Sequence, residues 1–196
     1  MPSLLLAAFA PELAGLDASL PRGWVAELTG VGAVSAAVAT ARLLAAHEPD
    51  RALFVGTCGA YDDRLPVGEV LSAAEAIATS VEELSGRAYR PEWERVRWVA
   101  TWALPFPGHP VAVPPAITRT AEGGRVLSGV APAEHLELTG VFAACHAAGV
   151  PVAAALGVAN RVGSGGHAEW RLSHARVSRA VVQSLVRAGV LAPRTP

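Results

Sequence analysis

The sequence predicts an α/β domain built around a largely buried sheet. Short apolar runs alternate with longer segments of helical pattern, which is the order expected when helices cover a sheet. The length of 196 residues suits one ordinary globular domain, spanning residues 1–196, with a sizeable core. We therefore expect a single α/β domain.

The strands are expected where the apolar runs are short, at residues 4–9, 52–55, 67–78, 97–104 and 152–159. Helices are expected at 34–47, which is rich in alanine and leucine, at 132–148, and at 170–188. Gly149 and Gly189 are the expected stop signals of the last two helices. Residues 86–115, rich in proline and tryptophan, are expected to form a loop-containing insertion.

Composition excludes several classes of function. A net charge of −1 with scattered arginines gives no broad attraction to nucleic acid or to a membrane surface. The first residues lack the basic region of a signal peptide, and no apolar stretch is long enough to span a bilayer. Two cysteines, Cys58 and Cys145, cannot form a disulfide scaffold and fit a reducing compartment, so we expect a cytoplasmic protein whose partner is a small molecule.

Polar groups stand near apolar runs at four places: Glu12, the segment GTCGA at 56–60, Glu137 in EHLELTG, and Asn160. Ligands of open α/β sheets bind at the carboxyl ends of strands, so these positions are candidates for a site. Each has a simpler reading as well. Glu12 suits the start of a helix, Glu137 a solvated helix face, the glycines of GTCGA a tight turn, and Asn160 a cap.

Taken in order, these segments resemble the nucleoside phosphorylase and nucleosidase superfamily. The matching segments are LLAAFAPEL, TGVGAVSAAVATARLL, FVGTCGAYDDRLPVGEVL and EHLELTGVFAACHAAGVPVAAALGVAN. The resemblance spans most of the chain except about 80–128. It implies a three-layer α/β/α sandwich with a central mixed sheet, and a homodimer or larger homo-oligomer.

The last segment decides the branch of the superfamily. Asn160 and Trp170 stand ten residues apart, and a strand ending in asparagine followed ten residues later by tryptophan resembles the futalosine hydrolases of menaquinone biosynthesis. The chemistry agrees, because an asparagine amide can donate to O6 of a 6-oxopurine while its carbonyl accepts from N7–H. Aspartate, found in adenosine-type nucleosidases, would suit a 6-amino group better.

The resemblance implies hydrolysis of an N-glycosidic bond through an oxocarbenium-like transition state. Glu12 would act as the general base on water, and Asn160 would hold the leaving purine. Glu137 would accept hydrogen bonds from the ribose hydroxyls, with Leu136 beside it at the position of the family's methionine. Two further residues, Thr57 and Gly59, would line the base or ribose side, and Trp170 would wall the pocket or be a core aromatic.

Phosphorolysis is the close alternative. One phosphorylase branch binds phosphate with an arginine where this chain has Phe54, and the family's other phosphate-binding arginine has no counterpart in AFAPELAGLD. A dianion without a cationic clamp binds poorly, which favours water as the nucleophile. No cofactor and no metal are predicted, and Cys58 is weighed and set aside as a nucleophile because GTCGA is not a nucleophile elbow.

Departures from the family's pattern leave other readings open. Ala159 stands where the family has serine, and residues 163–166 are glycine-rich, which predicts a looser loop over the substrate. A methylthioadenosine or S-adenosylhomocysteine nucleosidase, a purine nucleoside phosphorylase and a catalytically impaired nucleoside-binding protein remain alternatives. Phe106, Trp98 or Trp102 could cover the purine, and Arg161 or Arg119 could pair with a carboxylate on the ribose 5′ side.

Overall fold

The computed structural model describes residues 1–16 and 20–192; Asp17, the last residue of the AFAPELAGLD segment, lies outside them. Among these residues, eight strands, where the sequence indicated five, form one sheet that is mixed as the resemblance implied. They are β1 (Ser3–Ala7), β2 (Trp24–Leu28), β3 (Arg51–Ala60), β4 (Val70–Ala78), β5 (Arg97–Val99), β6 (Gly108–Val113), β7 (Ala133–Glu134) and β8 (Val152–Arg161). The helices are η1 (Ala10–Leu13, a 3₁₀ turn), α1 (Ala33–His47), α2 (Val81–Leu84), α3 (Ala121–Leu127), α4 (Leu138–Ala148) and α5 (Gly166–Arg187).

The sheet has the order β2-β1-β3-β7-β6-β4-β5, and β8 pairs with both β3 and β4. The β8–β3 pair is parallel and the β8–β4 pair is antiparallel, which makes the sheet mixed. Because β8 joins two strands that are also linked through β7 and β6, these five strands close into a ring. The carboxyl end of β3 therefore lies between the carboxyl end of β8 on one side and β7 on the other.

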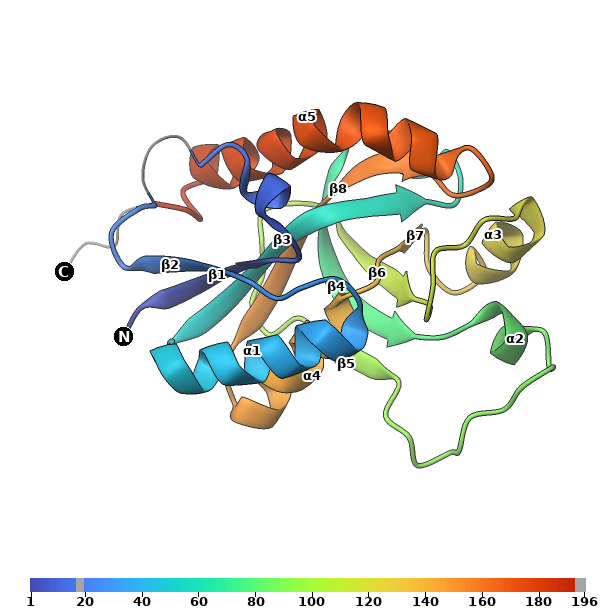
Figure 1. Ribbon diagram of the computed structural model, residues 1–196, viewed down its shortest axis with the longest axis horizontal. Helices are drawn as coiled ribbons and strands as arrows, with labels where there is room; N and C mark the ends of the chain where they lie inside the picture. The colour runs from blue at the N-terminus through green and yellow to red at the C-terminus, as the bar shows by residue number, and fades with distance from the viewer. Residues whose placement is uncertain (17–19, 193–196) are drawn as a thin grey trace.

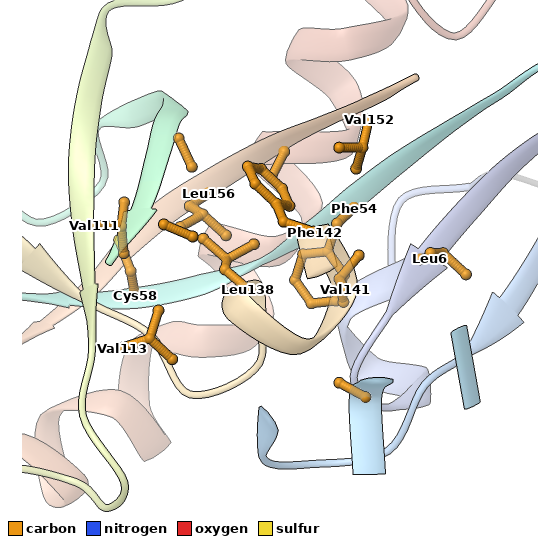
Figure 2. Packing of buried hydrophobic residues seen from close by; sticks show 14 of the residues in the cluster. Leu6, Phe54, Cys58, Val111, Val113, Leu138, Val141, Phe142, Val152 and Leu156 are labelled. Carbon is orange, nitrogen blue, oxygen red and sulfur yellow. The ribbon is translucent and has the colours of Figure 1, made fainter. Parts of the chain in front are cut away.

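Helices cover the two faces of the sheet, so the molecule has the three-layer arrangement expected (Figure 1). Helix α5 lies on one face, and α1 and α4 lie together on the other. Side chains alternate along β1: Leu4 and Leu6 belong to the core under α1 and α4, while Leu5 and Ala7 belong to the core under α5. Figure 2 shows the first core, where Phe142 of α4 packs with its buried neighbours.

Several sequence predictions need correction. The segment 132–148 is not one helix, because residues 133–134 form β7 and α4 begins only at Leu138. Residues 97–104 are a strand only over Arg97–Val99, the strand expected from 67 begins at Val70, and the insertion 86–115 contains all of β5 and β6. Strand β2 was not predicted. Short strands such as these are stabilised by pairing with partners distant in the sequence, which local patterns do not reveal.

Helix ends agree better with the sequence. Helix α4 ends at Gly149, whose φ of +66° is the left-handed conformation that glycine adopts readily. Gly189 follows the end of α5 with a similar φ of +71°. Among the described residues, no helix combines the length and the apolar character needed to cross a bilayer.

Candidate active site

A cavity of about 450 Å³ opens where the carboxyl ends of β1, β3 and β8 meet β7 and the start of α4. All seven site residues predicted from the sequence line it: Glu12, Thr57, Gly59, Leu136, Glu137, Asn160 and Trp170. The size suits a nucleoside-sized ligand. Residues more than a hundred positions apart in the sequence are thus brought together, although the roles given to them above stay predictions.

Glu12 is held by donors on both oxygens. It lies in the turn η1 directly after β1, and only 3% of its surface is exposed. Its Oε1 accepts from the Thr57 backbone N–H at 2.9 Å and from the Thr57 hydroxyl at 3.2 Å, while Oε2 accepts from the Ala8 N–H at 3.1 Å. The carboxyl group is therefore fixed across two strands and does not act as a simple helix-start carboxylate.

Burial raises the pKa of Glu12 from 4.5 to about 7. The hydrogen bonds from Thr57 and Ala8 favour the ionised form and oppose this shift, while the negative charge of Glu137 adds to it. A pKa near neutrality is what a general base working at pH 7 requires, because the group is then available as a base and still holds a proton well once it has accepted one.

Trp170 connects α5 to this carboxyl group through Thr57. The indole Nε1–H donates to the Thr57 hydroxyl at 3.1 Å, and that hydroxyl donates to Glu12. The indole ring stacks on His174 with centroids 4.2 Å apart and on His167 with centroids 5.7 Å apart. Trp170 thus lines the cavity and also fixes the orientation of the Thr57 hydroxyl.

Glu137 does not lie inside a helix as predicted, because it is the N-cap residue of α4. Its Oε1 accepts from the Gly32 N–H at 2.7 Å, at the start of α1, where the helix dipole favours a negative charge. The two helices approach closely because residue 140 is glycine; a Cβ there would lie 2.0 Å from the Ala33 carbonyl oxygen. The turn from Gly30 to Gly32 needs glycines for a different reason, since these two residues have φ of +79° and +88°, and its Gly32 N–H meets the carboxylate.

Two glycines pack closely against the amide of Asn160. A Cβ on Gly59 would lie 3.2 Å from Asn160 Nδ2, and a Cβ on Gly166 would lie 3.0 Å from the same atom and 2.6 Å from the Arg161 carbonyl oxygen. Nδ2 donates to that carbonyl at 2.9 Å. One N–H and the carbonyl oxygen of the amide remain for a ligand. The glycine at 166 is therefore a packing requirement as well as part of the turn after β8.

The segment GTCGA is not a tight turn, contrary to the prediction from its glycines. Residues 56–60 are the extended end of β3 and pair with β8 as far as Ala60 and Arg161, with an irregularity between Cys58 and Gly59. A Cβ on Gly56 would be tight, 3.0 Å from Phe54 Cε1 and 3.2 Å from Glu12 Oε1, so these side chains pack directly against the glycine. Burial raises the pKa of the Cys58 thiol to about 12, so it remains protonated and is unsuited to nucleophilic attack.

The cavity also contains residues that the sequence did not indicate. Glu134 and His135 were assigned to a helix and given no role, yet both are buried and line the cavity. Burial lowers the pKa of His135, although Glu137 beside it pulls the pKa the other way, and the neutral ring accepts from the Glu137 N–H at 3.1 Å through Nδ1. No local signal marks them, because β7 is only two residues long and Glu134 and His135 are adjacent polar residues that break a strand-like alternation.

Other expectations do not match the structure. None of Phe106, Trp98 and Trp102 lines the cavity; its aromatic and apolar walls include Phe9, Ile117 and Trp170. Arg161 is bound to the turn after β3, where it donates to the Leu65 carbonyl at 2.7 Å and pairs with Asp63 at 2.8 Å. Like Arg119, it is absent from the described cavity lining, which includes no arginine.

Comparison with known proteins identifies the class to which this fold and site belong. A model of the phosphorylase superfamily matches residues 23–130, more than half of the chain. The chain is therefore a member of the phosphorylase superfamily.

Solved structures of similar fold include nucleosidases. The 5′-methylthioadenosine/S-adenosylhomocysteine nucleosidase of Helicobacter pylori, with butyl-thio-DADMe-Immucillin-A, is 14% identical, with 96% of this chain and 97% of that chain covered and a TM-score of 0.84. The native futalosine hydrolase of Helicobacter pylori is 13% identical with the same coverages and TM-score. The adenine complex of the Colwellia psychrerythraea nucleosidase is 17% identical, covers 100% of this chain and 97% of its own, and has a TM-score of 0.82.

Proposed function

We propose that this protein hydrolyses the N-glycosidic bond of a 6-oxopurine nucleoside, and that futalosine is its substrate. The products would be hypoxanthine and dehypoxanthine futalosine, which places the reaction in menaquinone biosynthesis. The observation that carries the proposal is the cavity itself. It combines a buried carboxyl group with a pKa of about 7, a second carboxylate at a helix start and an amide, and the part of its lining that the structure describes includes no arginine or lysine.

In the proposed reaction, Glu12 accepts a proton from water as the water oxygen bonds to C1′ of the ribose. The C1′–N9 bond breaks, its electron pair stays with the purine, and the purine takes up a proton from solvent at N7. General base catalysis of this kind contributes typically about 10²–10⁴-fold. Asn160 accepts from the new N7–H through its carbonyl and donates to O6 through the N–H that Arg161 leaves free.

Glu137 is the proposed partner of the ribose hydroxyls, with Leu136 packing beside the sugar. A carboxylate already held by the Gly32 N–H at the start of α1 can accept hydroxyl hydrogen bonds without moving, so it fixes C1′ relative to Glu12. In this proposal Thr57 and Gly59, which line the cavity, lie between sugar and base, and Trp170, also in the lining, closes the pocket.

Hydrolysis is favoured over phosphorolysis by charge. Phosphate is a dianion that proteins bind with arginine or lysine, and the described lining of the cavity offers carboxylates and amides instead. Phosphate next to Glu12 and Glu137 would be repelled once Glu12 is ionised.

Base release from purified protein tests the proposal. Futalosine, inosine and 5′-methylthioadenosine are compared side by side, each with and without phosphate, and the released base is quantified by chromatography. We expect phosphate-independent release of hypoxanthine from futalosine. Adenine release from methylthioadenosine would favour the second candidate, a methylthioadenosine nucleosidase, which is supported by the similar folds of such enzymes.

Absence of release from all three nucleosides, with ligand binding retained, would identify a nucleoside-binding protein that has lost turnover. The cytoplasmic location and the homodimer or larger homo-oligomer also stay predictions; sedimentation equilibrium of the purified chain tests the second.

A further inference from the structure

His135 is a buried histidine on the wall of the cavity, and the mechanism above gives it no role. It directly follows the short strand β7, and only 5% of its surface is exposed. Burying an imidazole ring is costly unless its polar atoms are hydrogen-bonded, so each of the two ring nitrogens calls for a partner.

The Nδ1 atom of His135 is bonded to the backbone. It accepts from the N–H of Glu137, two residues further along the chain, at 3.1 Å. The Glu137 Oε2 lies equally close to Nδ1, but a backbone N–H can only donate, so Nδ1 is an acceptor and the ring hydrogen is on Nε2. Burial lowers the pKa of His135 and favours this neutral form. The ring therefore presents an N–H donor at Nε2.

This Nε2–H has no hydrogen-bond partner in the part of the chain that the structure describes. The ring is held in place, because Phe54 packs edge-on against it with centroids 5.3 Å apart while Nδ1 is bonded. Fully enclosed polar atoms without partners occur on Trp24, Thr40 and Ser178, whereas Nε2 belongs to a residue that lines the cavity. A fixed, buried donor at a cavity wall indicates contact with a ligand or a bound water.

The Nε2 atom and the carboxyl group of Glu12 converge beside Gly56. A Cβ built on this glycine would lie 3.1 Å from His135 Nε2 and 3.2 Å from Glu12 Oε1. The described contacts of the two side chains include no direct hydrogen bond between them. Two atoms that both lie about 3 Å from one point can share a single water, since the hydrogen bonds of a water are about 2.8 Å long. Both residues line the cavity, so such a water also faces the substrate.

We propose that His135 is a catalytic residue that holds the attacking water against Glu12 by donating its Nε2–H to the water oxygen. The water then donates one hydrogen to Glu12, accepts from His135 with one lone pair and directs the other lone pair at C1′ of the ribose. As the O–C1′ bond forms, the proton passes to Glu12 and the C1′–N9 electron pair leaves with the purine, while His135 keeps its own hydrogen. This inference rests on the proposed hydrolysis but not on which purine leaves.

Two substitutions separate the roles of the two ring nitrogens. In H135N, the side-chain oxygen stands near the position of Nδ1 and can accept from the Glu137 N–H, as asparagine does in an Asx turn, but no donor reaches the water. In H135Q, the longer side chain places an N–H near the position of Nε2 and leaves the Glu137 N–H without its acceptor. Steady-state kinetics are measured with whichever of futalosine, inosine and 5′-methylthioadenosine the wild type hydrolyses.

We expect H135N to lower kcat about 10- to 100-fold with KM nearly unchanged, because the water loses its orientation while Glu137 keeps its support. H135Q should keep kcat within about fivefold of the wild type and raise KM, because the carboxylate proposed to bind the ribose loses a backbone anchor. Both variants should bind the released base as the wild type does, which shows that they are folded. H47Q is the matched control, since His47 ends α1 and pairs with Glu27 outside the cavity lining; it should leave kcat and KM unchanged.

A wild-type kcat in H135N, or a kcat in H135Q no higher than that in H135N, would overturn the role of Nε2. The second result would assign His135 to the support of Glu137 alone. In both cases the wild type still releases base, so the proposed function stands. A wild-type protein that hydrolyses none of the three nucleosides overturns the proposed function together with this inference.

Discussion

Replacing Glu12 by glutamine should change how stability depends on pH. The ordinary pKa of 4.5 is raised to about 7 in the folded protein, so between these values the folded state binds more protons than the unfolded state. Stability contributed by Glu12 is therefore greatest at low pH and is lost as pH rises toward 7 and above. The whole shift corresponds to about 3 kcal/mol, of which about 2.5 kcal/mol falls between pH 5 and pH 8.5.

Urea unfolding of the wild type and E12Q at pH 5 and at pH 8.5 measures this term. The variant loses carboxylate hydrogen bonds to Ala8 and Thr57. The part of that loss that depends on ionisation is already contained in the shifted pKa, and the remainder is the same at both pH values and cancels. We expect E12Q to gain about 2 to 3 kcal/mol relative to the wild type on going to pH 8.5. A difference between the two proteins that does not vary with pH would refute the account of Glu12 as a carboxyl whose burial raises its pKa.

The same variant tests the proposed role in catalysis. E12Q should lose base release by at least about 100-fold while binding hypoxanthine nearly as well as the wild type. In the wild type, kcat/KM should rise with pH through a pKa near 7, because the base must be ionised to accept the proton from water. Collapse of binding in E12Q would show that the residue is structural, and a rate that falls between pH 6 and 8 would contradict its role as a base.

Three further substitutions probe the surroundings of the site. G166A should destabilise the protein by about 1–3 kcal/mol in thermal unfolding and lower kcat/KM, because its Cβ would meet Asn160 and Arg161. G165A has open space at its Cβ and is the matched control, so equal effects of the two would contradict the packing argument. W170F removes the hydrogen bond to Thr57 and should lower kcat/KM about 3- to 10-fold. W93F, at a residue 89% exposed, is the control and should leave kcat/KM unchanged. Equal kcat/KM values for the two variants would contradict the proposed connection between Trp170 and Glu12. N160D should weaken hypoxanthine binding at least about tenfold, since a carboxylate cannot donate to O6, and an unchanged Kd would argue against the amide's role.

The predictable parts of this molecule are those with local signals. Helix α4 ends at Gly149 because glycine adopts the left-handed conformation readily, and this end could be predicted from that residue alone. The start of α1 could be predicted from the alanine-rich pattern that follows Gly32. The strand β8 was expected nearly in full, because a long apolar run in an α/β chain is a buried strand. The strand continues two residues beyond the expected end, to Arg161, and therefore includes Asn160.

The parts that escaped prediction depend on distant partners. The glycines of GTCGA indicate a turn locally, yet β8 and β7 pair with that segment and keep it extended. The sequence predicts a helix at Glu134, yet β6 and β3 pair with β7 on its two sides and make this residue part of the sheet. The seven candidate residues that line the cavity were predicted through the order of several segments, whereas their contacts, such as Trp170 with Thr57, needed the structure.

Competition between futalosine and its 6-amino analogue, which differ only at the purine, tests the central claim most directly. Both substrates carry the same 5′ group, so the ratio of their kcat/KM values reports base recognition alone. The donor and acceptor pattern of Asn160 predicts at least about a tenfold preference for futalosine in the wild type, because the 6-amino base leaves hydrogen-bonding groups mismatched. Equal values, or a preference for the 6-amino nucleoside, would contradict the proposed hydrolysis of a 6-oxopurine nucleoside.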